Sequence, residues 1–195
     1  MADDGSPSLG MRPRTGGEDD PEVFCADEQR EVPVDLARWQ MLAEQVLRTE
    51  GIRGGTELSV LFVSRKDIAV LNAEHLGHEG ATDVLAFPID ASVLLSSDNA
   101  PSTGPDRAPI DPSDLPMLLG DVVICPAVAA EQAPTHAGTL DDELALLVVH
   151  GILHVLGHDH ATPEDAALMR RRELDLLQVH HWGGAAPAGF RQDQE

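Results

Sequence analysis

Apolar residues along the chain gather into four short runs that predict β-strands. The runs lie at residues 22–26, 57–64, 83–89 and 118–124, and they are rich in large apolar and β-branched side chains. Runs of this length and composition are typical of strands that are buried in a sheet. The pattern therefore predicts a small sheet whose strands are separated by segments of another kind.

Between these runs, apolar residues recur every three or four positions, which is the spacing of an α-helix. Residues 34–50 show it clearly, with Asp35 placed to cap the helix start. Four further helices are expected, over 64–75, 126–132, 139–157 and 162–177. Ser64, Thr139 and Thr162 each precede an acidic residue three positions on, a signature of helix N-termini. Because strands alternate with helices, we expect a single compact α/β domain with a mixed sheet of about four strands.

Three segments have too little apolar content to join this domain. Residues 1–21 form an acidic stretch rich in Gly and Pro, and residues 91–115 are dominated by Ser, Asp, Pro and Gly. Such compositions are typical of disordered or flexible chain. The sequence predicts a folded domain over 22–183, with a flexible insertion at 91–115 and disordered tails at 1–21 and 184–195.

Charge and aromatic content limit the ways in which this chain can bind nucleic acid. The 195 residues carry a formal net charge of -21, and aromatic residues make up 3% of the chain with no Tyr. Strong nonspecific binding relies on clustered cations, and RRM-like or OB-like binding relies on aromatic platforms. Both are poorly supplied, although about half of the net charge of -21 falls within residues 1–28 and 90–115.

Cysteine content and apolar run length indicate the compartment. Cys25 and Cys125 are too few for a disulfide scaffold or a four-thiolate metal site, which fits a reducing environment. The N-terminus has no basic start followed by an apolar run, and no stretch of roughly 18 apolar residues occurs. We expect a cytoplasmic protein that does not span a membrane.

A cluster of histidines carries the candidate chemistry. His150 and His154 are four residues apart, so on a helix their side chains face the same way and are separated by about 6 Å along the axis. Both rings can therefore point a nitrogen at one metal ion. Gly157 allows a sharp reversal that can bring either His158 or His160 back as a third ligand, and the longer offset favours His160. Three neutral imidazoles without a thiolate are typical of a catalytic zinc site with one open position, although nickel and cobalt also suit imidazole.

A zinc site with an open position predicts hydrolysis, because zinc-bound water has a pKa near ~7 and supplies hydroxide at neutral pH. The spacing is also similar to the zinc-protease pattern His-Glu-x-x-His-x-x-Gly-x-x-His, but Gly151 stands where those proteases have the general base. A zinc peptidase is therefore a minor alternative. The remaining histidines singled out, His78, His136, His180 and His181, are interpreted as surface residues.

The segment His-Gly-Ile-Leu-His-Val-Leu-Gly-His-Asp-His at 150–160 resembles the signature of the YbeY metal-dependent endoribonucleases. Upstream, Leu71-Asn72, the Thr-Asp-Val-Leu-Ala-Phe-Pro segment at 82–88 and the Leu-Gly-Asp-Val-Val-Ile-Cys segment at 119–125 are similar to the same family in the same order. The resemblance covers about residues 22–182. Two departures are Leu76, at the position of a family arginine, and His158, at the position of the usual Tyr.

The resemblance implies a compact α/β domain that cleaves single-stranded RNA, with a zinc ion held by His150, His154 and His160 at the floor of a cleft that the histidine-bearing helix lines. It also implies a role in 3′-end maturation of small-subunit rRNA and in ribosome quality control, with rRNA precursor and small-subunit components as partners. Whether water or the ribose 2′-hydroxyl is the nucleophile stays open. The alternative from another class is a ribosome-assembly binding factor with a chiefly structural metal.

Several charged residues are candidates for roles around the metal. Asp83 and Asp121 begin predicted strands and are candidates to hold ligating rings, although capping of strand ends explains them equally well. Asp159 is expected to orient the turn through backbone amides. Arg53, Arg65, Lys66 and the arginines at 170–172 are candidates to replace the cation missing at Leu76, and for 170–172 a solvated helix face is the favoured interpretation.

Overall fold

The fold is built on a four-stranded sheet in a computed structural model that describes residues 20–89 and 117–192. The strands are β1 (Glu22–Asp27), β2 (Thr56–Phe62), β3 (Val84–Pro88) and β4 (Met117–Ile124), and their order across the sheet is β1-β2-β4-β3. β1, β2 and β4 are parallel, whereas β3 runs antiparallel to β4. The predicted mixed sheet is confirmed. The insertion expected at 91–115 and residues 1–19 of the expected tail lie outside the described residues.

The helices begin at the capping residues that the sequence indicated. They are α1 (Leu36–Thr49), α2 (Arg65–Leu76), α4 (Pro126–Gln132), α5 (Leu140–Val155) and α6 (Pro163–His180), with a short 3-10 helix at Ala133–Thr135. In α1, α2, α5 and α6 a capping side chain accepts a hydrogen bond from a backbone N–H of the first turn. The accepting residues are Asp35, Ser64, Thr139 and Thr162. The predicted bounds therefore agree with the observed ones to within a few residues.

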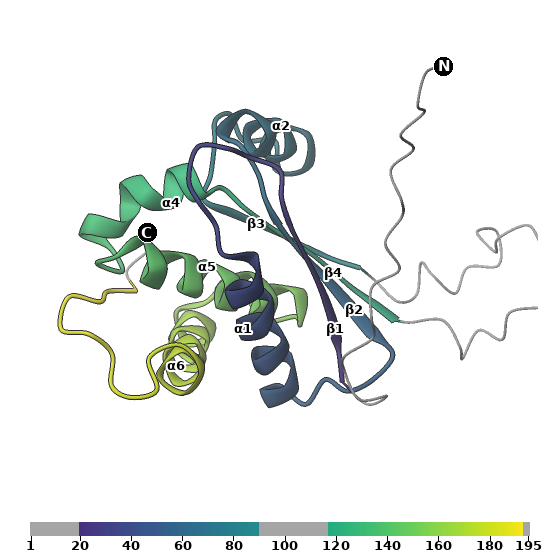
Figure 1. The fold of residues 1–195 in the computed structure, drawn as a ribbon, viewed down its shortest axis with the longest axis vertical. Helices are drawn as coiled ribbons and strands as arrows, with labels where there is room; N and C mark the ends of the chain where they lie inside the picture. Colours follow the sequence, from purple (N-terminus) through teal and green to yellow (C-terminus); the bar gives the residue numbers. More distant parts are fainter. Residues whose placement is uncertain (1–19, 90–116, 193–195) are drawn as a thin grey trace, which may run out of the picture.

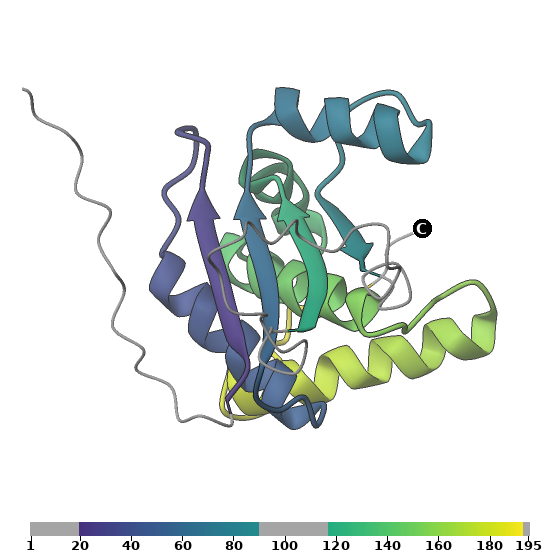
Figure 2. The ribbon, with the colours of Figure 1, turned by 90° about the vertical axis from the view of Figure 1, so that its right-hand side faces the viewer.

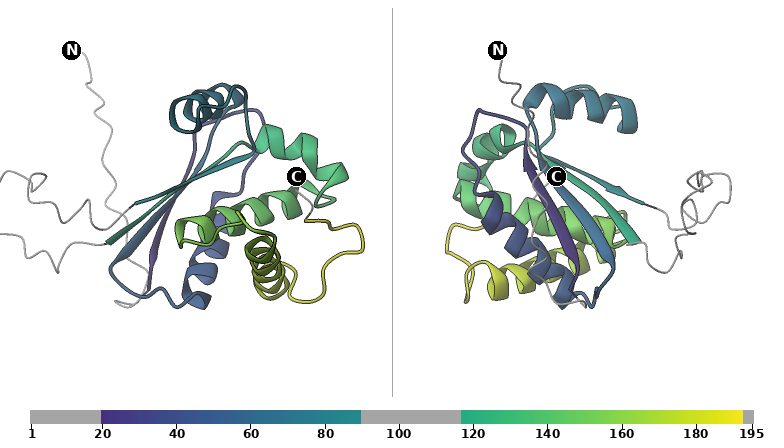
Figure 3. Two further views of the ribbon diagram at one scale, coloured as in Figure 1. Left: turned by 180° about the vertical axis from the view of Figure 1, so that it is seen from behind. Right: turned by 45° about the vertical axis from the view of Figure 1, so that its right-hand side comes forward.

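Helices α1, α5 and α6 lie together on one face of the sheet, and α2 crosses the sheet near one end (Figures 1 and 2). The same arrangement is seen from behind in Figure 3. The main hydrophobic core fills the space between the sheet and these three helices, and its fully buried side chains include Trp39, Leu47, Leu58, Phe62, Leu147 and Ile152. Full burial of each such side chain stabilises the fold by about 1.5–3 kcal/mol.

Helix α5 lies in the middle of the molecule. It packs against β3, β4, α1, α4 and α6, and most of its residues are buried. At Gly151 the helix comes so close to β4 that a Cβ atom would overlap the γ-methyl groups of Val122. Residue 151 therefore faces the sheet, and a glycine there lets α5 lie deep in the core.

The ordered part of the domain extends beyond residue 183, the predicted domain boundary, and the segment after α6 folds back over the helices. Residues 184–192, which we expected to belong to a disordered tail, are described by the structure and make specific contacts. The Phe190 ring meets the Trp182 ring edge to face with centroids 4.7 Å apart. The Arg191 N–H donates to the His136 carbonyl at 3.1 Å. Within the described part of the chain, no helix is long and apolar enough to cross a membrane.

Candidate metal centre

The last two turns of α5 present two histidines on one side. His150 and His154 are four residues apart, and their ring centroids lie 4.6 Å from one another. Helical geometry explains this closeness, because residues i and i+4 stack on the same face one turn apart. The pair confirms the juxtaposition that the spacing predicted.

A glycine turn after α5 brings the third ring to the pair. Gly157 has a φ of 91°, a left-handed conformation that residues with a side chain rarely adopt. Its N–H donates to the His154 carbonyl at 2.9 Å, and the His158 N–H donates to the Leu153 carbonyl at 2.9 Å. These two hydrogen bonds have the pattern of a Schellman motif, which ends the helix and reverses the chain. The predicted stop at Gly157 is confirmed.

The turn delivers His160, and not His158, to the cluster. The ring centroid of His160 lies 5.8 Å from that of His150 and 4.9 Å from that of His154. One ligand nitrogen from each of these three residues lies within 4.8 Å of the other two. His158 points elsewhere, with its Nε2 4.0 Å from the Glu50 carboxylate. Of the two alternatives for the third position, the geometry favours His160.

The donor set suits a divalent metal ion. Burial, followed by the positive charges that His150 and His160 carry when protonated, lowers the pKa of His154 below its ordinary value. A lowered pKa keeps this ring neutral at physiological pH, and a neutral imidazole is the form that binds metal. His150 and His154 are partly buried and His160 is exposed, so the cluster lies at the surface end of α5.

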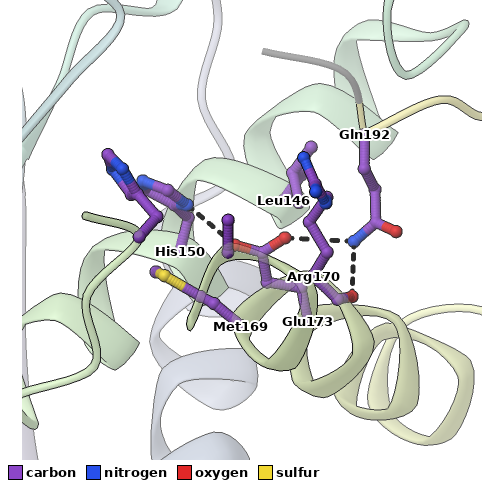
Figure 4. A pocket seen from close by; sticks show the side chains of 8 residues that line it. Leu146, His150, Met169, Arg170, Glu173 and Gln192 are labelled. Atoms are coloured by element: carbon purple, nitrogen blue, oxygen red, sulfur yellow. Dashed lines mark hydrogen bonds and ion pairs between the residues drawn. The ribbon is translucent and has the colours of Figure 1, made fainter. Parts of the chain in front are cut away.

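Glu173 on α6 holds the His150 ring. Its carboxylate Oε1 lies 2.7 Å from Nδ1 of His150, and the residue is 3% exposed (Figure 4). A carboxylate accepts and does not donate, so Nδ1 carries the proton and Nε2 is left for a metal. Metal-ligating histidines usually donate their other N–H in this way. Glu173 is not among the residues that the sequence predicts for the site; the only signal for it in the sequence is an acidic residue on an otherwise apolar face of the helix.

A cavity of about 240 Å³ lies beside the cluster, between α5 and α6. His150 and His160 form part of its lining, so the predicted cleft beside the histidine-bearing helix is present. The rest of the lining combines apolar and polar side chains, among them Leu146, Met169, Arg170, Glu173 and Gln192 (Figure 4). The cavity therefore offers both hydrogen-bonding groups and a positive charge next to the candidate ligands.

Two of the predicted aspartates organise turns. Asp159 Oδ1 accepts a hydrogen bond from the His160 N–H at 2.7 Å, which is the turn-orienting role expected of it. Asp83 is buried, and its Oδ1 accepts from the Val84 N–H at 2.8 Å and from the Thr82 hydroxyl at 3.1 Å. Asp83 thus caps the start of β3, which is the second of the two roles considered for it.

The other two predicted residues lie away from the cluster. Asp121 neighbours Val122, whose side chain faces α5, so strand alternation places Asp121 on the opposite face of the sheet. There it borders a separate hollow together with Ser59. Arg53 donates from one guanidinium nitrogen to the carbonyls of Arg48 and Ile52, at 2.6 Å and 2.9 Å, and so caps the end of α1.

The remaining cations differ in their availability. Arg65 pairs with Glu131 at 2.5 Å, and Arg172 pairs with Glu50 at 2.6 Å. Arg170 and Arg171 are exposed, and Arg170 alone of the two lines the cavity beside the histidines. Leu76, at the end of α2, is 56% exposed.

Two histidines interpreted as surface residues are buried, so that interpretation was wrong for them. Nδ1 of His136 contacts the Glu143 carboxylate at 2.8 Å, and Nε2 of His181 contacts Asp142 at 2.9 Å. Both acids lie in the first turns of α5, where the helix dipole favours negative charge. Packing of the chain after α6 and of the 3-10 helix onto α5 covers these rings, which the local sequence does not reveal. His78 is exposed as expected.

Fold and site together define an α/β domain with a three-histidine candidate metal centre and a carboxylate behind one ligand. A family model described as Endoribonuclease YbeY matches residues 24–181. The chain belongs to the endoribonuclease YbeY family. This membership agrees with the resemblance of segment 150–160 to the family signature.

Curated relatives agree over most of the chain. A protein named Endoribonuclease YbeY from Frankia casuarinae is 41% identical over 84% of this chain and 75% of its own length. Proteins of the same name from Frankia alni and Acidothermus cellulolyticus are 40% and 46% identical, over 86% and 75% of this chain and 90% and 81% of their own lengths. A solution structure of a Thermotoga maritima protein covers 85% of this chain and 98% of its own at 20% identity, with a TM-score of 0.46.

Proposed function

We propose that this protein is a zinc-dependent endoribonuclease that cleaves single-stranded RNA. The observation that carries the proposal is the convergence of His150, His154 and His160 on one point, in a chain whose curated relatives are named endoribonucleases. Bound by these three imidazoles, zinc would supply an activated water or polarise a phosphate oxygen.

The chain's own residues prepare this site. Glu173 fixes the tautomer of His150, so that Nε2 is the nitrogen left to bind metal. The lowered pKa of His154 keeps its ring in the metal-binding form. Gly157 sets the reversal that returns His160. Each of these features favours binding of a divalent cation before any substrate arrives.

We further propose that the natural substrate is an rRNA precursor, cleaved during 3′-end maturation of the small subunit and in ribosome quality control, with small-subunit components as partners in the cytoplasm. Support comes from the family signature at 150–160 and from the related segments at 71–72, 82–88 and 119–125. Arg170, exposed beside the cavity, supplies a positive charge for a phosphate backbone.

Metal analysis and an RNA digest test the proposal together. We expect purified protein to carry about one zinc per chain, to cleave single-stranded RNA in preference to duplex RNA, and to lose cleavage with a chelator. His154→Ala should lose both zinc and cleavage while the metal-free proteins melt alike. A wild-type protein that contains no tightly bound metal and leaves RNA intact contradicts the proposal.

The cleavage products identify the nucleophile. Attack by the ribose 2′-hydroxyl leaves a 2′,3′-cyclic phosphate, whereas direct hydrolysis by water does not. Mass spectrometry of the product ends separates the two routes, and either result is compatible with the proposed endoribonuclease.

A ribosome-assembly binding factor with a structural metal is the second candidate. The net charge of -21 and the apolar Leu76 favour it, because both weaken contacts with RNA. This candidate predicts that His154→Ala unfolds the protein and that the wild type never cleaves RNA. A zinc peptidase is disfavoured, since residue 151 has no side chain to act as general base and a larger residue there would overlap the γ-methyl groups of Val122.

A further inference from the structure

We propose that Gln192 is a positioning residue of the metal centre, acting on His150 through Glu173. The inference rests on the proposed metal site and extends it to the segment that follows α6. Two hydrogen bonds in series join the three side chains. The Glu173 carboxylate accepts from His150 Nδ1 with Oε1 at 2.7 Å and from Gln192 Nε2 with Oε2 at 3.0 Å (Figure 4).

Both oxygens of this carboxylate need a partner because the residue is buried. Glu173 is 3% exposed, and a buried carboxylate without hydrogen-bond donors loses several kcal/mol of hydration. His150 satisfies one oxygen and Gln192 the other. With both satisfied, the plane of the carboxylate is fixed, and so is the direction from which it holds the His150 ring.

The Gln192 amide is itself held in place. Its Nε2 also donates to the Arg170 carbonyl at 2.9 Å, so the amide nitrogen contacts two groups of the same helix, α6. A primary amide nitrogen has two hydrogens, and this geometry uses both. Substitution by Ala removes both contacts and leaves Oε2 of Glu173 to water entering from the cavity that Gln192 lines.

Three contacts lead the chain to this position. The Trp182 indole N–H donates to Asp142 of α5 at 2.6 Å. Phe190 packs on the Trp182 ring with centroids 4.7 Å apart. The Arg191 N–H then donates to the His136 carbonyl at 3.1 Å. Residue 192 therefore follows directly after an anchored stretch, and its side chain reaches α6 from a defined backbone position.

The consequence is that a residue near the C-terminus tunes the affinity of the metal site without touching the metal. Loss of an outer hydrogen-bond partner of a metal ligand typically lowers metal affinity by about 10–100-fold. We expect Glu173→Ala to fall in that range, and Gln192→Ala to weaken Zn²⁺ binding by roughly tenfold or less, since it acts one contact further out.

The test measures Zn²⁺ affinity of the full chain by competition with a chromophoric chelator, together with the melting temperature of the metal-free protein. The variants are Gln192→Ala, Glu173→Ala, the double variant, and Gln178→Ala as a matched control. Gln178 lies near the end of α6, and among the described residues its side-chain amide has no hydrogen-bond partner. Removal of the same amide there should leave Zn²⁺ affinity unchanged.

Two results together support the proposal: Gln192→Ala weakens Zn²⁺ binding relative to Gln178→Ala while both metal-free proteins remain folded, and it adds no further loss in the Glu173→Ala background. Equal affinity of Gln192→Ala and Gln178→Ala overturns it, as does an undiminished effect of Gln192→Ala when Glu173 is absent. A wild-type chain with no tight Zn²⁺ site overturns the proposed metal centre as well, which is a distinct result.

Nitrogen NMR of the imidazole groups gives a second readout. In the zinc-loaded wild type we expect His150 to carry its proton on Nδ1, the nitrogen that faces Glu173. A shift of the His150 signals in Gln192→Ala, with those of His154 retained, supports positioning. Identical His150 signals in the two proteins contradict it.

Discussion

At the scale of single residues, the histidines of this chain differ by the group that each one faces. One ring nitrogen of His150 faces the Glu173 carboxylate, and the ring lies beside those of His154 and His160 in the candidate metal centre. His181 faces Asp142, and His136 faces Glu143, in the interior. The same side chain thus serves as a candidate ligand at one position and as a buried hydrogen-bond partner at another.

The first prediction separates the two histidines that follow Gly157. His160→Ala should lower Zn²⁺ affinity more than about 100-fold, because even an outer-shell loss weakens binding by about 10–100-fold. His158→Ala should leave the affinity close to that of the wild type, since its ring lies toward Glu50. Chelator competition on both variants checks this, and equal losses in the two would contradict the assignment of the third ligand.

The second prediction concerns Asp142 and acid. Burial alone raises the pKa of Asp142, but hydrogen bonds from Thr139, Trp182 and His181 outweigh it and lower the pKa below its ordinary value. A carboxyl with a lowered folded pKa stabilises the protein above its unfolded pKa of about 3.9, and this contribution is lost as pH falls through the folded value.

Asp142→Asn resembles the protonated acid, so its destabilisation should be largest near neutral pH and should shrink below about pH 4. Urea unfolding of wild type and variant from neutral pH toward pH 3 measures the difference. Asp175→Asn, at an exposed position of α6, is the control and should show little difference at any pH. A gap for Asp142→Asn that stays constant with pH would refute the linkage.

At the scale of elements, α5 determines where the site lies. The helix is apolar almost all round, which is typical of a helix buried on all sides. Its first turns hold the buried acids Asp142 and Glu143, and its last turns hold His150 and His154. Because α5 passes through the core, the elements that pack on it fix the position of the candidate metal centre.

The third prediction tests the close approach of α5 to the sheet. Gly151→Ala should lower the free energy of unfolding by about 1–3 kcal/mol, because the added methyl group overpacks against Val122. The intrinsic helix preference of Ala, about 1 kcal/mol over Gly, acts in the opposite direction and is the smaller effect. Urea denaturation measures the change.

Val122→Ala provides the matched background, since it opens space opposite residue 151. It should lower stability by itself, but Gly151→Ala should then cost nothing further. If Gly151→Ala stabilised the wild type, helix preference would dominate and the packing argument would fail.

At the scale of the whole molecule, charge works against an RNA substrate. The chain carries a formal net charge of -21, so repulsion from phosphates must be overcome locally. The Zn²⁺ ion proposed for the histidine site would supply two positive charges, and Arg170, which lines the adjacent cavity, supplies one more. Among the described residues, the Arg170 guanidinium has no carboxylate partner, whereas Arg172 is paired with Glu50.

The fourth prediction follows from this distribution. Arg170→Ala should weaken binding of single-stranded RNA by roughly 2- to 5-fold, the equivalent of an exposed ion pair. The salt dependence, log K against log salt, should flatten by about 0.7 for one lost phosphate contact. Fluorescence anisotropy at several salt concentrations measures both. Arg171→Ala removes the same charge one residue away, outside the cavity lining, and equal effects of the two would show a general charge effect only.

Most of the fold and the histidine cluster could be predicted because their signals are local in sequence. Caps such as Thr139 and Thr162 lie within three residues of the N–H groups that they satisfy. The cluster spans only residues 150–160, where helix spacing and one glycine turn determine the geometry. The sequence also disfavours a zinc peptidase by a local signal, because Gly151 stands at the position of the general base in the zinc-protease pattern.

Only the tertiary structure shows which groups hydrogen-bond to the candidate ligand His150, directly or through Glu173, and which histidines are buried. Glu173 is 23 positions from His150, and Gln192 is 19 positions further on, yet hydrogen bonds join all three. His181 meets an acid 39 positions away. Such contacts depend on how α6 and the following segment pack on α5, and no spacing rule reports the relative placement of separate elements. The sequence by itself thus determined the candidate ligands, and packing determined how they are held.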